Sequence, residues 1–315
     1  MTSHVHSSKH LLIVNPAAGG GTAEVSIPMI EKTLGNYGVS FELVRTEAPL
    51  HAISLAREAV RDGFDVVVAV GGDGTANEVL NGLVEAKLAN EGEAALGVLC
   101  VGRGNDFAYG AGIPHALGDG CRALAEGNRS TIDIGRVEGG LYPDGRYFGN
   151  GVGIGFDAVV GFEAKKLKRF RGFAGYLIAA LRTIFLYFRA PTVRLEHDEG
   201  SRELPALMVS VMNGRRMGGG FLMAPEARMG DGAFDLCVAR QVGRLAIFRL
   251  IGRFLKGTQA GHPAIWFGRT KRIVVEAMDG ALPAHADGET LCTDAEWLVL
   301  ELLPRQLDVV CGGRT

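Results

Sequence analysis

Three glycines and one aspartate follow an apolar run in the first third of the chain, and their types and spacing suggest phosphate chemistry. The run Val66–Val70 leads directly into the sequence Gly71-Gly72-Asp73-Gly74-Thr75. Glycines leave main-chain N–H groups open to a ligand, and Asp73 could hold a magnesium ion beside a polyphosphate. The alternative is a strand-to-helix turn that needs its glycines only for conformation.

Two further apolar runs end in glycine-rich segments. Leu11–Val14 is followed by Asn15–Gly21, and Leu96–Val101 is followed by Gly102–Ala108. Because the carboxyl ends of parallel strands lie together in an α/β sheet, we expect the three segments to meet at one crevice, where such folds bind ligands. Together they favour nucleotide binding over a plain turn.

The second half of the chain carries more motifs, and their order is characteristic. They are Asn150–Asp157, Asn213-Gly214 with Gly218–Gly220, Ala224–Ala227, Gly230–Gly232 and Asp287–Glu289. With these motifs the sequence resembles the diacylglycerol kinase and sphingosine kinase superfamily, in the form of the soluble bacterial lipid kinases, from about Leu11 onward.

The resemblance implies an α/β fold class, with an N-terminal α/β nucleotide-binding domain of the NAD kinase and phosphofructokinase type followed by an antiparallel β-sandwich domain. We expect the nucleotide-binding domain at 9–130 and the lipid-substrate domain at 131–304, with a C-terminal strand at 305–315 returning to the first domain. The active site is expected in the cleft between them.

The resemblance also implies ATP as phosphate donor, Mg²⁺ as cofactor and a lipid hydroxyl as acceptor. Asp73 is expected to organise the catalytic Mg²⁺, and Glu289 to take or orient the proton of the acceptor. Without the resemblance, Asp287-Gly288 would indicate a solvated hairpin turn. The expected nucleotide contacts are Asn15, Pro16, Ala17, Ala18, Gly19, Thr46, Gly71, Gly72, Asp73, Gly74, Thr75, Ala76, Asn77, Glu78, Arg103, Asn105, Asp106 and Asp287.

Arg103 departs from the family pattern, which has threonine at this position. An arginine brings a permanent charge and planar donors that suit phosphate oxygens. In one alternative, the Arg103 side chain turns into the crevice and binds phosphate oxygens. In the other, Arg103 points to solvent and the backbone at Gly102 and Gly104 makes the nucleotide contact.

A second, structural Mg²⁺ is implied at Asp231. The resemblance assigns it the Asp231 carboxylate with the main-chain carbonyls of Arg228 and Ala233, an oxygen set that a hard cation accepts. The alternative is a plain turn with a solvated aspartate.

Several acceptors and activities stay open. Diacylglycerol is the first expectation, with a sphingoid base, ceramide, phosphatidylglycerol or a non-lipid alcohol as alternatives. The chain contains no Gly-Lys pair, which excludes a P-loop lysine, and no Gly-x-Gly-x-x-Gly opens its first helix. NAD kinase is the enzymatic rival because it shares the Gly-Gly-Asp-Gly turn, and a catalytically weak lipid-binding or regulatory protein is the non-enzymatic one.

Composition narrows the class of protein. The chain has 315 residues and 47% hydrophobic content, which is enough to form the cores of one or two domains. Its formal charge of −2 argues against a nucleic-acid partner. Its five cysteines are scattered without a Cys-x-x-Cys pair, so we expect reduced thiols in the cytoplasm. The segment 1–10 has no apolar stretch typical of a signal peptide. Oligomeric state cannot be read from the sequence.

The elements that must position these groups follow from periodicity. We expect strands at about 10–14, 39–45, 65–70 and 96–101, alternating with helices at about 24–36, 50–62, 75–89 and 114–126. From about Ser130 onward, short apolar runs separated by turn residues favour an all-β second domain. Its expected strands include 193–196, 206–212, 233–239, 272–277, 297–303 and a last strand at 307–310.

Two basic amphipathic stretches suggest peripheral contact with an anionic membrane at the inner surface. Lys165–Arg171 precedes the apolar segment Gly175–Phe188, which is too short to span a bilayer. Arg244–Lys256 places Arg249, Arg253 and Lys256 on one helical side. The alternative is that the apolar faces pack on the sandwich while the cations are solvated.

Overall fold

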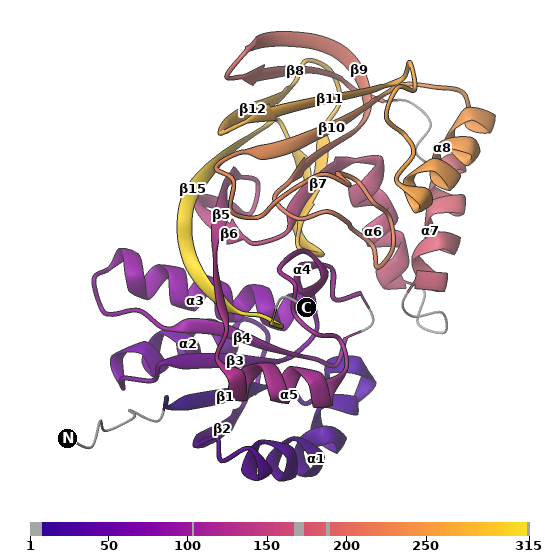
Figure 1. Cartoon of the computed structure of the whole chain (residues 1–315). Helices are drawn as coiled ribbons and strands as arrows, with labels where there is room; N and C mark the ends of the chain where they lie inside the picture. Colours follow the sequence, from indigo (N-terminus) through magenta and orange to yellow (C-terminus); the bar gives the residue numbers. More distant parts are fainter. Residues whose placement is uncertain (1–7, 103, 167–172, 187–189, 314–315) are drawn as a thin grey trace. The chain divides into compact units, whose positions relative to one another are not determined.

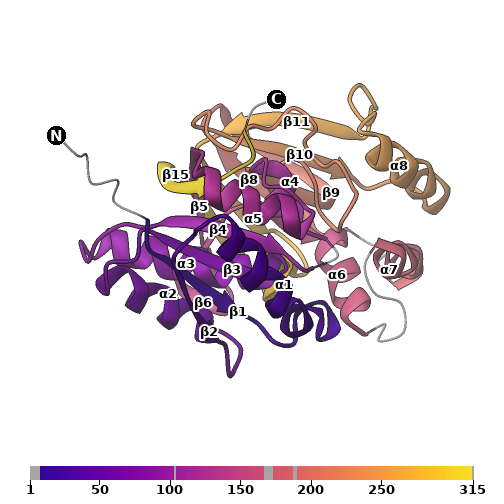
Figure 2. The ribbon, with the colours of Figure 1, turned by 60° about the horizontal axis from the view of Figure 1, so that its bottom comes forward.

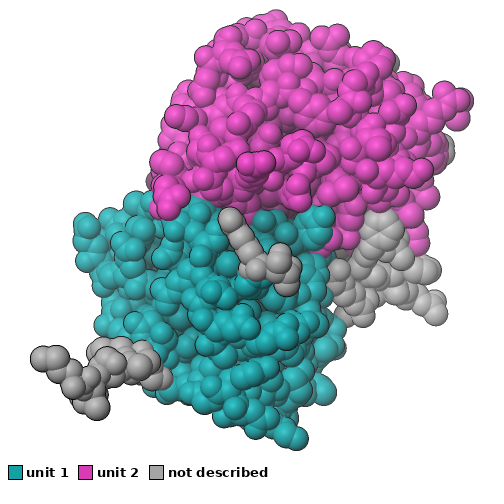
Figure 3. Space-filling view, in the orientation of Figure 1, with its two compact units in different colours: residues 1–132, 306–315 teal, residues 133–305 magenta. Residues whose placement is uncertain are grey.

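The computed structural model describes residues 8–102, 104–166, 173–186 and 190–313. The chain divides into two compact units (Figure 3). Unit 1 comprises residues 1–132 and 306–315, and unit 2 comprises residues 133–305.

Unit 1 is built on a parallel sheet whose strand order is β2-β1-β3-β4. The strands are β1 (His10–Val14), β2 (Phe41–Arg45), β3 (Val66–Gly71) and β4 (Ala95–Cys100). Every residue of β1, β3 and β4 is buried. A central strand of a parallel sheet is covered on both faces, which explains why these runs are apolar throughout instead of alternating.

Helices cover both faces of this sheet (Figures 1 and 2). Helices α1 (Thr22–Asn36) and α5 (Leu117–Glu126) pack together with one set of strand side chains, including Leu12, Val68 and Leu99. Helices α2 (His51–Arg61) and α3 (Asp73–Leu88) pack together on the other face. The short helix α4 (Asp106–Gly110) and the 3₁₀ turn η1 (Ala18–Gly20) were not predicted, because one turn of helix carries no apolar period.

Unit 2 is an antiparallel sandwich. One layer has the order β14-β13-β7-β9-β10-β11, and the other has β9-β8-β12-β15-β5-β6, so the long strand β9 takes part in both. Their bounds are β5 (Arg129–Gly139), β6 (Tyr142–Phe148), β7 (Gly151–Gly155), β8 (Thr192–His197), β9 (Gly200–Met212), β10 (Phe234–Arg240), β11 (Ile265–Thr270), β12 (Arg272–Ala277), β13 (Leu282–Ala286), β14 (Glu289–Ala295) and β15 (Trp297–Val310).

The expected antiparallel sandwich is confirmed, but unit 2 also contains helices and is therefore not all-β. Helices α6 (Phe156–Lys166), α7 (Phe173–Leu186) and α8 (Arg244–Lys256) pack on the outward residues of β9 and β10, such as Met208 and Cys237 (Figure 1). This second face of the sheet is as apolar as the first, and the helices shield it from water.

Strand β15 is longer than expected. The sequence predicted separate strands at 297–303 and 307–310, but both belong to one strand, with a positive φ of 49° at Arg305. Val309 pairs in parallel with Leu96 of β4, and the residues from Gln306 onward belong to unit 1.

The contact between α2 and α3 allows no side chain at Gly82. A Cβ built there would lie 2.3 Å from the Ile53 carbonyl oxygen and 2.8 Å from Ala56 Cβ. We therefore expect Gly82→Ala to lower the free energy of unfolding by about 1–3 kcal/mol, because the helices must separate. Urea unfolding measures the change.

Gly118→Ala is the matched control. Gly118 lies in α5, and a Cβ there would meet nothing within 4 Å. Alanine should leave stability unchanged or raise it by up to about 1 kcal/mol through helix propensity. Equal unfolding curves for the two variants would contradict the packing argument.

Candidate functional site

The site in unit 1 begins where β3 ends. Gly72 precedes α3, and Asp73 is its first residue. The first N–H groups of a helix have no intrahelical partner and carry the positive end of the helix dipole, so this position suits an anion. Asn15 Nδ2 donates to Thr75 Oγ1 at 3.1 Å, and the Ala17 N–H donates to Asn15 Oδ1 at 3.1 Å. These bonds join the turn after β1 to the turn after β3.

The turn after β4 closes on the same aspartate. The Phe107 N–H donates to Asp73 Oδ1 at 3.1 Å, and a Cβ at Gly104 would lie 2.9 Å from Asp73 Oδ2. A Cβ at Gly102 would lie 2.6 Å from Gly72 Cα, so the two backbones touch where side chains would stand. Asn105 holds this turn with a φ of 51° and a bond from its Nδ2 to the Gly102 carbonyl at 2.9 Å. The three segments singled out in the sequence therefore meet around Asp73.

The other expected nucleotide contacts lie in the turn after β1, at the end of β3, in α3, at the start of α4 and after β2. Pro16, Ala17, Ala18 and Gly19 belong to the turn after β1, where Gly19 has a φ of 63°, and Gly74 is the second residue of α3. Gly71 and Ala76 are buried, and Asp106 opens α4 with 8% of its surface exposed. Thr46 follows β2, and its N–H donates to the Val14 carbonyl at 2.9 Å.

Two residues expected at the nucleotide are bound to protein groups. Asn77 is 2% exposed and its Oδ1 accepts from Asn81 Nδ2 at 3.2 Å. Glu78 Oε2 accepts the Ala52 N–H at 3.2 Å, which satisfies a donor at the start of α2. Arg103 lies outside the described residues.

In unit 2, Asp287 and Gly288 form the turn between β13 and β14. Their φ angles are 48° and 85°, as a two-residue type I′ hairpin requires, and Ala286 pairs with Glu289. The alternative of a hairpin turn is confirmed for the backbone of this motif. Asp287 is not solvated, however, because only 7% of its surface is exposed.

The Asp287 carboxylate fastens the hairpin to the start of β7. Its Oδ2 accepts the Gly149 N–H at 2.8 Å, and its Oδ1 accepts the N–H groups of Asn150 at 3.0 Å and Gly151 at 2.9 Å. These N–H groups replace the water that a buried carboxylate loses. The half-buried Glu289 is the first residue of β14, so its position follows from the anchored turn.

Asp133, which the sequence analysis did not single out, anchors a second group of loops. Its Oδ1 accepts the Arg305 N–H and its Oδ2 accepts the Gly232 N–H, each at 2.7 Å. Asn213 Nδ2 donates to the carbonyls of Asp133 and Gly149, both at 2.8 Å. An isolated aspartate inside a strand sequence carries no local signal for such a role.

The loop with Asp231 is held by protein groups. Asp231 Oδ2 accepts from Arg269 Nη2 at 2.5 Å, while Arg228 and Ala233 flank the turn. Within the described residues, no group of three or more His, Cys, Asp or Glu side chains could hold a metal ion. Asp235, the second residue of β10, has its pKa raised by burial.

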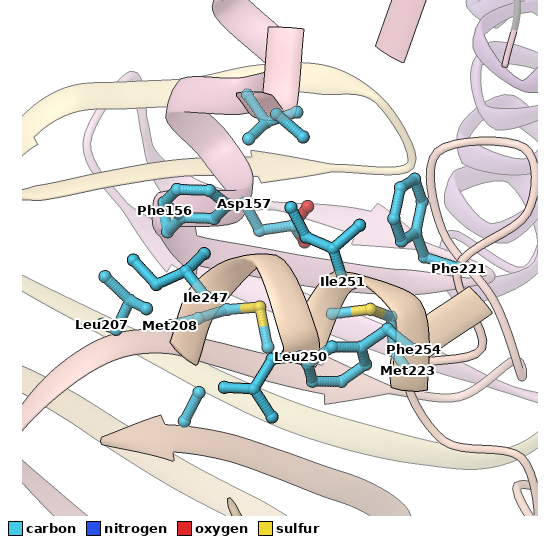
Figure 4. A pocket seen from close by; sticks show the side chains of 13 residues that line it. Phe156, Asp157, Leu207, Met208, Phe221, Met223, Ile247, Leu250, Ile251 and Phe254 are labelled. Carbon is cyan, nitrogen blue, oxygen red and sulfur yellow. The ribbon is translucent and has the colours of Figure 1, made fainter. Parts of the chain in front are cut away.

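An apolar pocket lies between the helices of unit 2 and the outer face of β9 and β10. It measures about 540 Å³ when its open mouth is included. Its lining residues are Phe156, Asp157, Val160, Ala180, Leu207, Met208, Phe221, Met223, Ala239, Ile247, Leu250, Ile251 and Phe254 (Figure 4). The sequence did not predict this pocket, because its walls come from six separate segments.

Asp157 is the charged residue in the pocket lining. Its carboxylate reaches the space near Ile251 and Phe221 (Figure 4), and its Oδ2 lies 3.5 Å from His285 Nε2. Burial, together with the charge of Asp157, raises the pKa of Cys237 to about 12, so that thiol stays protonated.

The helices are too short or too polar to cross a bilayer, as far as the described residues go.

Two family descriptions match the chain. Residues 9–137 match the diacylglycerol kinase catalytic domain, and residues 150–311 match the YegS C-terminal NAD kinase beta sandwich-like domain.

Curated relatives agree with these matches. A protein of Chromohalobacter salexigens named as a YegS-like lipid kinase is 31% identical over 238 residues, covering 75% of this chain and 73% of its own length. A diacylglycerol kinase of Staphylococcus saprophyticus is 26% identical over 279 residues, covering 88% of each chain.

Solved structures show the same fold. A diacylglycerol kinase structure from Bacillus anthracis is 23% identical and aligns over 96% of both chains with a TM-score of 0.73. Yeast NADH kinase, 9% identical, aligns over 99% of this chain and 85% of its own with a TM-score of 0.53. The matched domains and the 31% identical relative show that this chain is a kinase of the lipid kinase family that joins a diacylglycerol kinase catalytic domain to a YegS-type sandwich domain.

Proposed function

We propose that this protein transfers the γ-phosphoryl group of ATP to a lipid hydroxyl, with diacylglycerol as acceptor and phosphatidic acid as product. The observation that carries the lipid assignment is the apolar pocket of unit 2, whose lining contains one carboxylate among aliphatic, aromatic and methionine side chains. A pocket of this composition suits a hydrocarbon chain with a polar end group.

The turns of unit 1 fit the phosphates of ATP. Gly72 and Gly102 are in backbone contact beside the N-terminus of α3, and neither has a side chain that would cover its main-chain N–H group. Asp73 supplies the hard oxygen that Mg²⁺ prefers. When bound, Mg²⁺ would neutralise charge on the transferring phosphate.

Glu289 is the proposed proton acceptor for the lipid hydroxyl. The Asp287 anchor fixes the start of β14 and with it the backbone of Glu289, so little positional freedom has to be lost when the acceptor binds.

The direct test is phosphoryl transfer from γ-labelled ATP to a panel of acceptors. The panel contains diacylglycerol, sphingosine, ceramide, phosphatidylglycerol and NAD. We expect labelled phosphatidic acid as the main product. Labelled NADP with no labelled lipid would assign the chain to the NAD kinase activity instead, and no labelled product from any acceptor would favour a lipid-binding or regulatory protein.

We expect Asp73→Asn to lower kcat by roughly 10²–10³-fold, because the metal-organising charge is lost. Asparagine keeps an oxygen for the Phe107 N–H, so the fold should remain intact. Asp62→Asn, an exposed aspartate at the end of α2, is the matched control and should turn over at the wild-type rate. Steady-state kinetics decides, and an active Asp73→Asn enzyme would remove the metal assignment.

Glu289→Gln should lower kcat by roughly 10²–10⁴-fold, the usual contribution of a general base. The affinity for ATP, measured by titration, should stay unchanged. Glu296→Gln changes an exposed glutamate of the same unit and serves as control. If both variants matched the wild type, Glu289 would have no part in proton transfer.

The structural Mg²⁺ at Asp231 is proposed from the resemblance and competes with the ion pair to Arg269. If the ion binds there, Mg²⁺ should raise the melting temperature of the wild type but not of Asp231→Ala, since a ligand of the folded state stabilises by about 2.7 kcal/mol at 100 times its Kd. Identical Mg²⁺ responses would leave the Arg269 ion pair as the means of ordering this loop.

A further inference from the structure

Helix α8 has a buried apolar face and an exposed cationic face. Its inner residues Ile247, Leu250, Ile251 and Phe254 line the apolar pocket. The sequence-based alternative, that the apolar side of this helix packs on the sandwich, is therefore right for this face.

The outer face combines cations with exposed apolar side chains. Arg244, Arg249, Arg253 and Lys256 are exposed, and no acidic residue occurs between Arg244 and Lys256. On the same face, Leu245 is 78% exposed and Phe248 is 40% exposed. Helical spacing places Leu245, Arg249, Arg253 and Lys256 on one side, since they follow one another at intervals of three or four residues, and Phe248 lies three residues from Leu245.

Two cations of this face, Arg249 and Lys256, are available to a partner. Neither Arg249 nor Lys256 forms an ion pair with a residue that the structure describes, and Arg253 donates to the Thr258 carbonyl at 2.9 Å. A cationic helix with large apolar residues among its charges matches the interface of a bilayer, where lipid phosphates meet the cations and acyl chains receive the apolar groups.

We propose that α8 docks the protein on an anionic lipid bilayer, with Leu245 and Phe248 entering the interface and the cations of the outer face binding lipid phosphates. The choice of a bilayer as partner rests on the proposed lipid kinase function. Because the opposite face of α8 forms a wall of the apolar pocket, docking would bring the pocket to the membrane that holds the acceptor. Of the other basic stretch, residues 167–171 lie outside the described residues, and the proposal does not use them.

The test is sedimentation of the full chain with vesicles, in the absence of ATP. Vesicles of phosphatidylcholine are compared with vesicles that also contain phosphatidylglycerol. The wild type should bind the anionic vesicles more tightly, and salt should weaken the binding. Equal and salt-insensitive binding to both, or none to either, would overturn the proposal.

Two double variants locate the surface. Arg249→Gln with Lys256→Gln should weaken binding on the order of twentyfold, because each cation near an anionic surface contributes roughly fivefold. Leu245→Gln with Phe248→Gln should weaken it as well, by removing the inserted groups. Lys271→Gln, an exposed lysine between β11 and β12, should bind as the wild type does. Unchanged binding by both double variants would overturn the assignment to α8.

Two further measurements separate this inference from the proposed function. Turnover on short-chain diacylglycerol in detergent micelles should be the same for Arg249→Gln with Lys256→Gln and for the wild type. If neither the wild type nor any variant phosphorylates lipid, but the wild type still binds anionic vesicles through α8, the kinase proposal is wrong and the docking proposal is supported. If sedimentation velocity instead shows self-association that the double variants abolish, with vesicle binding unchanged, the face belongs to a second copy of the chain.

Discussion

The arrangement of unit 1 depends on two positions that have little or no space for a Cβ atom, Gly72 and Gly102. The backbones of Gly72 and Gly102 approach so closely that a Cβ on Gly102 would lie 2.6 Å from Gly72 Cα. This contact lets the turn after β4 reach Asp73, and the Phe107 N–H then bonds to its carboxylate. With larger residues the two turns would separate, and the aspartate would lose the neighbour that orients it.

In unit 2, buried carboxylates hold the loops in place. Asp287 and Asp133 are 7% and 0% exposed, and both accept backbone N–H groups from segments distant in sequence. Burying a charge is costly unless hydrogen bonds replace water, and bonds to charged groups contribute about 1.5–3 kcal/mol each. These two side chains therefore order the loops around β7, β14 and β15.

The helices of unit 2 connect the fold to the proposed substrate. They cover the outer face of β9 and β10, and the imperfect fit between helix and sheet leaves the apolar pocket. Gly153 contributes to the polar end of this region, since a Cβ there would lie 2.2 Å from Asp157 Oδ2 and 2.7 Å from His285 Nε2. The same helix α8 that lines the pocket carries the cationic outer face. The apolar pocket and the cationic face are thus on opposite sides of one helix.

The sequence by itself determined the features that are local. Apolar runs ending in glycines identified the strands of unit 1 and the turns that meet at Asp73, because turn conformation and strand burial depend on neighbouring residues. The Asp-Gly hairpin was readable for the same reason. The tertiary structure decided what depends on distant contacts: Asn77 and Glu78 bind protein groups, Asp287 is buried under three N–H donors, and Asp133 joins loops about 100 or more residues away. It also decided that helices cover unit 2 and enclose a pocket, since no single segment records which residues will face one another after folding.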